Sequence, residues 1–275
     1  MYIQAHFTNG AGNQLFQYFF AYLLARHHNA TLLHSQLDVI EVNEKMDVCM
    51  QGIEFDHVIG RYETDFLRFF EEPFWRNLKL GRCYPEDYRI YIPHIDHLKS
   101  QFPPPSEVNE RDLVFHLRLG DRLLRRQDYE LGMKLDLTQL LGAINKIDFE
   151  RLHIVTDMPY WRKLVPYDIK QMRFHMMPGE KRRIEPEIAC DHFNNIVDFF
   201  SDFDLVVHTG NNVSEDFKFI RSFKKVLFQH ATLSWWAAAI GNAEQVGVYG
   251  PWRPNAGKLN RNLGRTPLPG WFSWG

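Results

Sequence analysis

The sequence lacks the cysteine pattern of a disulfide-stapled or zinc-binding protein. Its 275 residues contain only three cysteines, Cys49, Cys83 and Cys190, which are widely spaced and form no CxxC pair. Disulfide frameworks and structural zinc sites need cysteines or histidines at close, regular spacing, so neither can organise this fold. Reduced thiols are typical of cytosolic proteins, and we therefore expect a cytoplasmic location.

A long hydrophobic run is also missing. The stretch LFQYFFAYLLA covers residues 15–25, whereas a helix needs about 20 apolar residues to span a bilayer. It follows a polar, glycine-rich turn and has no basic segment before it, unlike a signal peptide. We expect a buried helix over residues 14–28. Peripheral association with the inner face of a membrane stays open.

Neither sign of charge is in excess. The 32 Lys and Arg residues nearly balance the 34 Asp and Glu residues, for a net charge of −2, so no nucleic-acid partner is expected. Hydrophobic residues at 45% and charged residues at 24% are the proportions of a globular protein. The aromatic content of 15% is high and predicts a large aromatic core.

The turn Gly10-Ala11-Gly12-Asn13-Gln14 lacks the third glycine of a GxGxxG dinucleotide motif. It lies between a predicted strand at residues 2–7 and the predicted helix, and a second strand is expected at residues 30–34. Glycines and a helix start can admit an anionic ligand. Asn13 as the N-cap of a tight turn is the simpler alternative.

Three consecutive prolines, Pro103, Pro104 and Pro105, divide the chain because proline cannot continue a helix or a central strand. We expect an N-terminal α/β domain over residues 1–105 and a C-terminal α/β domain over residues 106–275. Short apolar strands alternate with helices in the second domain, which predicts a parallel, doubly wound sheet. Strands are expected at residues 113–117, 153–156, 173–176, 205–208 and 225–228, and helices at 135–147, 159–165, 192–200, 215–223 and 233–243. Residues 38–98 show no assignable pattern.

Two motifs follow predicted strands of the second domain. In His116-Leu117-Arg118-Leu119-Gly120-Asp121, the guanidinium of Arg118 can grip a diphosphate in bidentate fashion, although an ion pair with Asp121 is equally compatible with the spacing. In HATLSWW, Thr232 and Ser234 stand at a helix start, where they either cap the helix or help it bind a phosphate.

Together, GAGNQLFQYFFAYLLA, HLRLGD and HATLSWWAAAIG resemble the bacterial α-1,2-fucosyltransferases and the wider superfamily of inverting fucosyltransferases. The resemblance spans residues 3–243. It implies a GT-B architecture, with two Rossmann-like domains facing a cleft, a GDP-fucose donor, a glycan acceptor and no cofactor or metal ion. The oligomeric state is not implied.

The resemblance also assigns roles to individual residues. Arg118 and Asp121 become the candidate catalytic residues. The candidate donor-binding residues are Gly12, Asn13, His116, Arg118, Asp216, Thr232, Leu233 and Ser234. Arg118 and the residues from Thr232 to Ser234 would bind the donor phosphates, Asp216 would bind guanine with His116 nearby, and Asn13 would reach the donor. The family's second adjacent arginine is replaced here by Leu119.

The implied reaction is a single displacement in which an acceptor hydroxyl replaces GDP on the fucosyl anomeric carbon, in polysaccharide biosynthesis, with an α-1,2 linkage favoured. Asp121, Asp128, Glu130 and His6 are candidates for the general base. Three alternatives stay open: a different GDP-sugar donor, a metal-dependent GT-A glycosyltransferase using Asp202 and Asp204, and a non-catalytic glycan- or nucleotide-binding protein.

Overall fold

The computed structural model describes residues 1–35, 37, 53–60, 62–71, 73, 76–124, 135–172, 184–229, 231–249 and 268–274. The chain divides into two compact units. Unit 1 holds the described residues of 1–106, 231–241 and 268–270. Unit 2 holds those of 107–229, 242–249 and 271–274. Each unit contains its own parallel sheet, which confirms the predicted α/β class.

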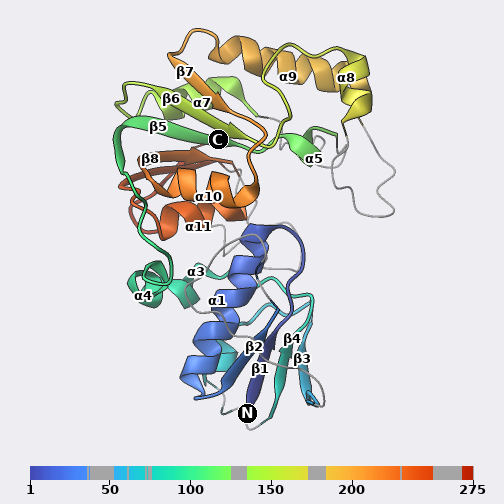
Figure 1. Cartoon of the computed structure of the whole chain (residues 1–275), viewed down its shortest axis with the longest axis vertical. Helices are drawn as coiled ribbons and strands as arrows, with labels where there is room; N and C mark the ends of the chain where they lie inside the picture. The colour runs from blue at the N-terminus through green and yellow to red at the C-terminus, as the bar shows by residue number, and fades with distance from the viewer. Residues whose placement is uncertain are drawn as a thin grey trace. The chain divides into compact units, whose positions relative to one another are not determined.

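The sheet of unit 1 has four parallel strands in the order β2-β1-β4-β3 (Figure 1). The strands are β1 (Tyr2–Ala5), β2 (Thr31–His34), β3 (His57–Ile59) and β4 (Leu78–Leu80). The helices are α1 (Ala11–His27), α2 (Arg68–Glu71), α3 (Tyr88–Tyr91), the 3-10 turn η1 (Ile92–His94), α4 (Ile95–Lys99) and α11 (Thr232–Ala239). The predicted βαβ opening is confirmed, and it continues into two strands that the sequence analysis did not identify.

The central part of helix α1 is buried on all sides, as its largely apolar sequence predicts. Every residue from Leu15 to Ala25 is buried. Phe16 and Phe19 pack against Trp236 of α11, with ring centroids 4.8 and 4.7 Å apart, and much of the aromatic surplus therefore forms core. The helix ends at His27, and Asn29 follows with φ of 50°, a left-handed conformation typical of a helix C-terminus.

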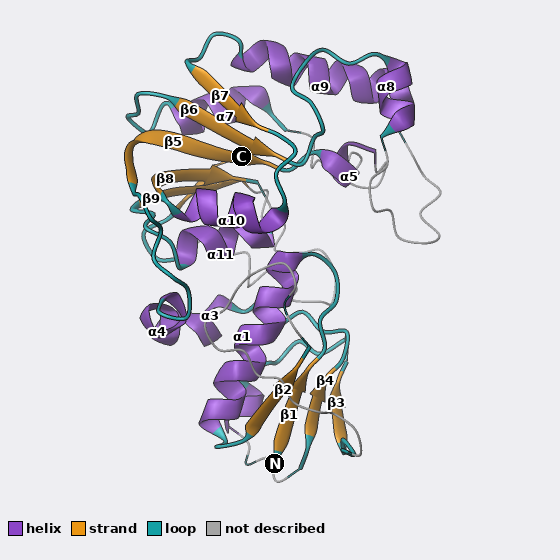
Figure 2. Ribbon diagram, viewed as in Figure 1, coloured by secondary structure: helices purple, strands orange, loops and turns teal. Residues whose placement is uncertain are grey.

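The sheet of unit 2 has six parallel strands in the order β10-β9-β8-β5-β6-β7 (Figure 2). The strands are β5 (Asn109–Leu117), β6 (Leu152–Thr156), β7 (Leu205–His208), β8 (Phe223–Phe228), β9 (Gln245–Tyr249) and β10 (Phe272–Trp274). The helices are α5 (Gly120–Leu124), α7 (Leu137–Ile144), α8 (Pro166–Gln171), α9 (Pro186–Phe200) and α10 (Val213–Arg221). Counted from β5 in chain order, the strands lie 6-5-4-1-2-3, which is the Rossmann arrangement.

Helices cover both faces of this sheet. On one face, Leu113, Phe115 and Leu117 of β5 join a core that includes residues of α7 and α9. Strand alternation sends Asp112 and His116 to the opposite face, where α10 packs. The predicted doubly wound sheet is thus present in unit 2.

Several predicted elements differ from the structure. Residues 159–165 are not helical, and the helix begins instead at Pro166, whose fixed φ suits a first helical position. The predicted strand at residues 173–176 lies outside the described residues. Strands β9 and β10 were not predicted.

The assignment of everything after residue 105 to one C-terminal domain needs a correction. Helix α11 belongs to unit 1, because Trp235 and Trp236 pack against Phe16 of α1 with ring centroids 5.1 and 4.8 Å apart. In the chain, α11 lies between β8 and β9 of unit 2. It nevertheless packs in unit 1, because burial of both indoles in that aromatic core is energetically favourable.

Candidate functional site

The strand order of unit 2 reverses between β5 and β8, which are direct neighbours. In open parallel sheets, ligands bind outside the carboxyl ends of the strands at such a reversal. The motif from His116 to Gly120 leaves the carboxyl end of β5, where His116 pairs with Phe228 at the end of β8. The tertiary structure therefore places this motif at the expected ligand-binding edge of the sheet.

His116 is an uncharged histidine at this edge. It is 5% exposed, and burial, together with the positive charges of Arg118 and Arg122, lowers its pKa to about 3. An imidazole that stays neutral at physiological pH can donate one hydrogen bond and accept another. Arg118, two residues later, is half-buried and contributes its positive charge to the same edge.

Asp157 was not identified from the sequence, although it directly follows β6 at the same edge. Its Oδ1 atom accepts hydrogen bonds from the backbone N–H groups of Leu119 and Gly120, both at 2.9 Å. A Cβ atom on Gly120 would collide with this carboxylate, which explains the glycine of the HLRLGD motif. Leu119 itself is 4% exposed, and its side chain packs in the hydrophobic core.

Asp216 lies in the first turn of α10, the helix on the same face of the sheet as His116. It is 9% exposed, and its Oδ1 accepts a hydrogen bond from Asn211 Nδ2 at 3.2 Å. Burial is the main cause that raises its pKa to about 6, with further contributions from the negative charges of Asp157 and Glu215. A buried carboxylate that is costly to ionise is typical of a binding site.

The candidate donor-binding residues of α1 and α11 lie close together in unit 1. A Cβ atom on Gly12 would collide with the backbone of Thr232 and Leu233, so the start of α1 touches the start of α11. Thr232 and Ser234 are both buried. Asn13 lies beside Gly12, and among the described residues its buried Oδ1 atom has no hydrogen-bond partner.

The caps of these two helices differ from the simpler alternatives in the sequence analysis. The N-cap of α1 is Gly10, and Asn13 lies inside the first turn. The N-cap of α11 is Ala231, with Thr232 and Ser234 inside the helix, and no hydrogen bond from a side chain of the N-cap satisfies its first N–H groups. Helix starts carry backbone N–H groups that can bind an anion.

The other candidates divide into three groups. The side chain of Asp121, and with it the proposed ion pair to Arg118, lies outside the described residues, as do Asp128 and Glu130. His6 is exposed just beyond the carboxyl end of β1. Asp202 and Asp204 precede β7, and Asp204 pairs with Arg151 at 3.1 Å, so they lie at the amino edge of the sheet, opposite the ligand-binding edge.

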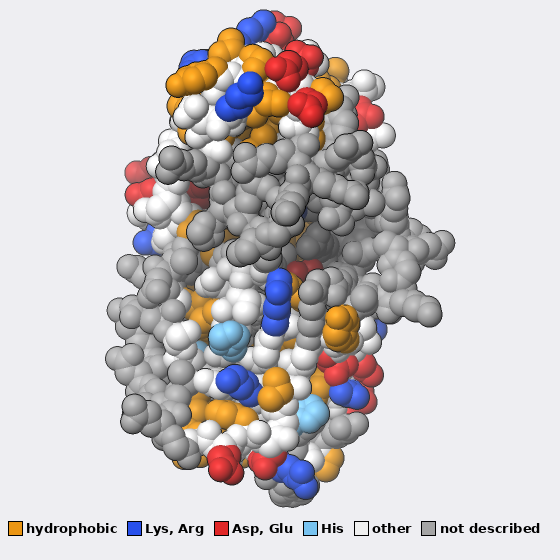
Figure 3. All heavy atoms as spheres, turned by 90° about the vertical axis from the view of Figure 1, so that its right-hand side faces the viewer, with side chains coloured by type: hydrophobic (Ala, Val, Ile, Leu, Met, Phe, Trp, Pro, Cys, Tyr) orange, Lys and Arg blue, Asp and Glu red, His pale blue; other side chains and the backbone are white. Residues whose placement is uncertain are grey.

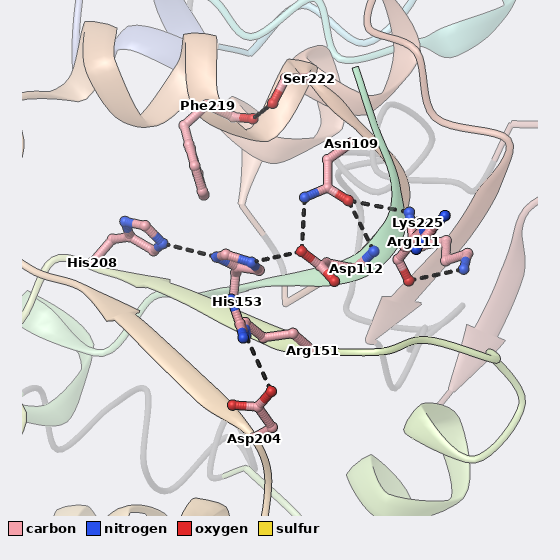
Figure 4. Close-up of polar contacts among 10 residues, drawn as sticks. All are labelled: Asn109, Arg111, Asp112, Arg151, His153, Asp204, His208, Phe219, Ser222 and Lys225. Carbon is pink, nitrogen blue, oxygen red and sulfur yellow. Dashed lines mark hydrogen bonds and ion pairs between the residues drawn. The ribbon is translucent and has the colours of Figure 1, made fainter. Parts of the chain in front are cut away.

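A second polar group missed by the sequence analysis lies on the α10 face of the same sheet (Figure 4). His153 Nε2 donates to Asp112 Oδ2 at 3.1 Å, and His153 Nδ1 lies 3.1 Å from His208 Nε2. Burial and the neighbouring His153 lower the pKa of His208. Phe219 of α10 covers both rings.

Basic and acidic side chains are interspersed among the described residues of the face drawn in Figure 3. This distribution agrees with the net charge of −2. Within the described ranges, the structure contains no helix that is long and apolar enough to span a membrane.

The chain matches no protein-family model and no curated protein sequence. It is similar to the crystal structure of the fucosyltransferase NodZ from Bradyrhizobium, with 12% sequence identity and a TM-score of 0.41. The similarity covers 86% of this chain and 92% of that chain.

Proposed function

We propose that this protein is an inverting glycosyltransferase that transfers a sugar from a GDP-sugar, with GDP-β-L-fucose as the favoured donor, to a hydroxyl of a glycan. The α-1,2 linkage of the family it resembles is the favoured product. The observation that carries the proposal is the grouping of Arg118, His116 and Asp216 at the carboxyl edge of the Rossmann-type sheet of unit 2. These groups match the chemistry of a guanine diphosphate.

Asp216 is proposed to bind the guanine base. A carboxylate can accept hydrogen bonds from both N1–H and the exocyclic amine of guanine, and no other common nucleobase presents these two donors side by side. Ligand donors would replace the water that the buried carboxylate has lost, so binding also relieves the cost of ionising a group whose pKa is raised to about 6.

Arg118 is proposed to bind the diphosphate. As the sugar departs from GDP, negative charge builds on the β-phosphate, and a fixed guanidinium stabilises that charge where it develops. In unit 1, the start of α11 is proposed to bind phosphate oxygens through Thr232, Leu233 and Ser234. Gly12 permits the approach to α11, and Asn13 offers an unsatisfied amide oxygen for a donor hydroxyl.

These residues supply the positive charge and hydrogen bonds that the displacement needs, so we propose a reaction without a metal ion or other cofactor. The acceptor hydroxyl attacks the anomeric carbon, the bond to the β-phosphate oxygen breaks, and the configuration inverts. A general base takes the hydroxyl proton; Asp121 and His6 are proposed for this role, with Asp128 and Glu130 as further candidates. The proposed setting is polysaccharide biosynthesis in the cytoplasm.

One observation favours a second version of this function. Because Leu119 is buried in the core where the family has a second arginine, the diphosphate site has one positive charge fewer. A GDP-sugar other than GDP-fucose is therefore the second candidate donor.

A thermal-shift screen with GDP, UDP, ADP and CMP tests the nucleotide. We expect GDP to raise the melting temperature most, because only guanine satisfies Asp216 with two donors. A larger shift with UDP would contradict the guanine site. Hydrolysis of GDP-fucose and GDP-mannose, measured with and without a chelator, then separates the two donors, the metal-dependent alternative and a protein that binds without turnover.

A further inference from the structure

The backbone of Arg118 is held on both sides at the end of β5. Before it, Leu117 pairs with Thr156, the last residue of β6. After it, the N–H of Leu119 donates to Asp157 Oδ1 at 2.9 Å, and Asp157 is the next residue after Thr156. The peptide that joins Arg118 to Leu119 is therefore fixed by the carboxylate of Asp157.

The same carboxylate also holds the start of α5. Gly120, the first residue of that helix, donates its N–H to Asp157 Oδ1 at 2.9 Å. A Cβ atom on Gly120 would lie 2.2 Å from Asp157 Oδ2, so a side chain there would displace the carboxylate. Hydrogen bonds to a charged oxygen are stronger than hydrogen bonds between neutral groups. The two bonds to Asp157 therefore restrict the conformation of the turn after Arg118.

We propose that Asp157 is the positioning residue that holds Arg118 in the orientation needed to stabilise the departing diphosphate. Asp157 acts through Arg118 and the two peptide groups after it, and not by contact with the sugar. This inference rests on the proposed function, because it assigns Asp157 to the same reaction. If the guanidinium is displaced by about 1 Å, the rate of the reaction falls on the order of a hundredfold, even though the fold is intact.

A double-mutant cycle on GDP-fucose hydrolysis tests the proposal without knowledge of the acceptor, because water can replace the acceptor hydroxyl. We expect Asp157→Ala to lower kcat about 100-fold and to change the Kd for GDP less than threefold. Asp157→Asn keeps an oxygen acceptor without its charge and should lower kcat about tenfold. In the double variant Asp157→Ala/Arg118→Ala, kcat should stay within about threefold of the kcat of Arg118→Ala, because the effects of substituting residues that act as a unit are not additive.

The guanine site provides a second readout. Asp216 faces Asn211, Glu215 and Asp157, and the negative charge of Asp157 is one of the causes that raise its pKa. Removing that charge in Asp157→Asn should lower the pKa of Asp216 and shift the acid limb of GDP binding to lower pH. This shift tests the electrostatic interaction between the two carboxylates, whereas the kcat criteria test the positioning role.

Asp148→Asn is the matched control and should behave as the wild type, because Asp148 is exposed and precedes β6 at the amino edge of the sheet. Unchanged kcat in both Asp157 variants, or losses that multiply in the double variant, would overturn the positioning role while leaving the proposed function intact. A wild type that neither binds GDP nor hydrolyses GDP-fucose would overturn both. Should Asp157→Ala fail to fold, the same cycle with Asp157→Asn applies the same criteria.

Discussion

Gly12 of α1 lies directly against the backbone of Thr232, the first residue of α11, and leaves no room for a side chain between them. The two residues are far apart in the sequence, yet both helix starts belong to unit 1. The glycine therefore has a packing role that is independent of any ligand, and this role can be measured.

Gly12→Ala should destabilise the protein, because a methyl group would collide with backbone atoms that cannot rotate away. We expect a loss of about 1–3 kcal/mol in the free energy of unfolding, the usual cost of overpacking. Chemical denaturation measures it. Gly60→Ala is the control, since a Cβ there meets nothing within 4 Å, and it should change stability by less than about 0.5 kcal/mol. Equal effects of the two substitutions would contradict the close contact.

Arg118→Ala should lower kcat for GDP-sugar turnover by about 100-fold or more, the cost of losing a charge contact in the transition state. Its melting temperature should stay near that of the wild type, because Arg118 is only half-buried. Arg111→Ala is the matched control: this arginine lies on the same strand at its amino end, exposed and paired with Glu150. Full activity in Arg118→Ala would remove Arg118 from the donor site.

Asp216→Asn should make the free protein more stable at pH 7–8. The folded carboxyl has a raised pKa of about 6, so wild-type stability is lost as pH rises from about 4 through 6, and the amide avoids that loss. The gain should be about 1–2 kcal/mol, which allows for partial screening by solvent. It should vanish below pH 4, where the wild-type carboxyl is protonated in both folded and unfolded chains. Unfolding at several pH values measures the difference.

The same substitution should weaken GDP binding at pH 7–8 by about tenfold or more, because the amide replaces an acceptor oxygen with a donor. In the wild type, the affinity for GDP should fall as pH drops below about 6, when Asp216 becomes protonated. Calorimetry across this range would contradict the guanine site if the wild-type affinity stayed constant or if the variant bound GDP equally well.

Asp112→Asn should destabilise the protein at neutral pH by about 1–2 kcal/mol, through the loss of a charged hydrogen-bond acceptor. Burial raises the pKa of Asp112, but hydrogen bonds from Asn109 and His153 outweigh it, and the net shift is downward. The stabilisation is therefore present above the ordinary pKa of 3.8 and is lost as pH falls through the lower folded value. Asp204→Asn, which breaks an exposed pair with Arg151, should cost less than about 1 kcal/mol at any pH.

Elements with local signals can be predicted from the amino-acid sequence alone. The apolar run from Leu15 to Ala25 predicted a fully buried helix, and the short apolar segment LVVH predicted β7 with the bounds observed. Apolar strands in alternation with helices predicted the doubly wound sheet of unit 2. Hydrophobic periodicity encodes these features because each depends on neighbours within a few residues.

Other features depend on contacts between residues that are distant in the sequence, and these become visible only in the folded chain. The three-residue strands β3 and β4 carry too little pattern of their own and are defined by pairing with each other and with β1. Helix α11 joins unit 1 because its tryptophans pack on α1. Asp157 acquires its place beside Gly120 only when β5 and β6 pair, since hydrogen bonds between residues 37 positions apart leave no trace in local sequence.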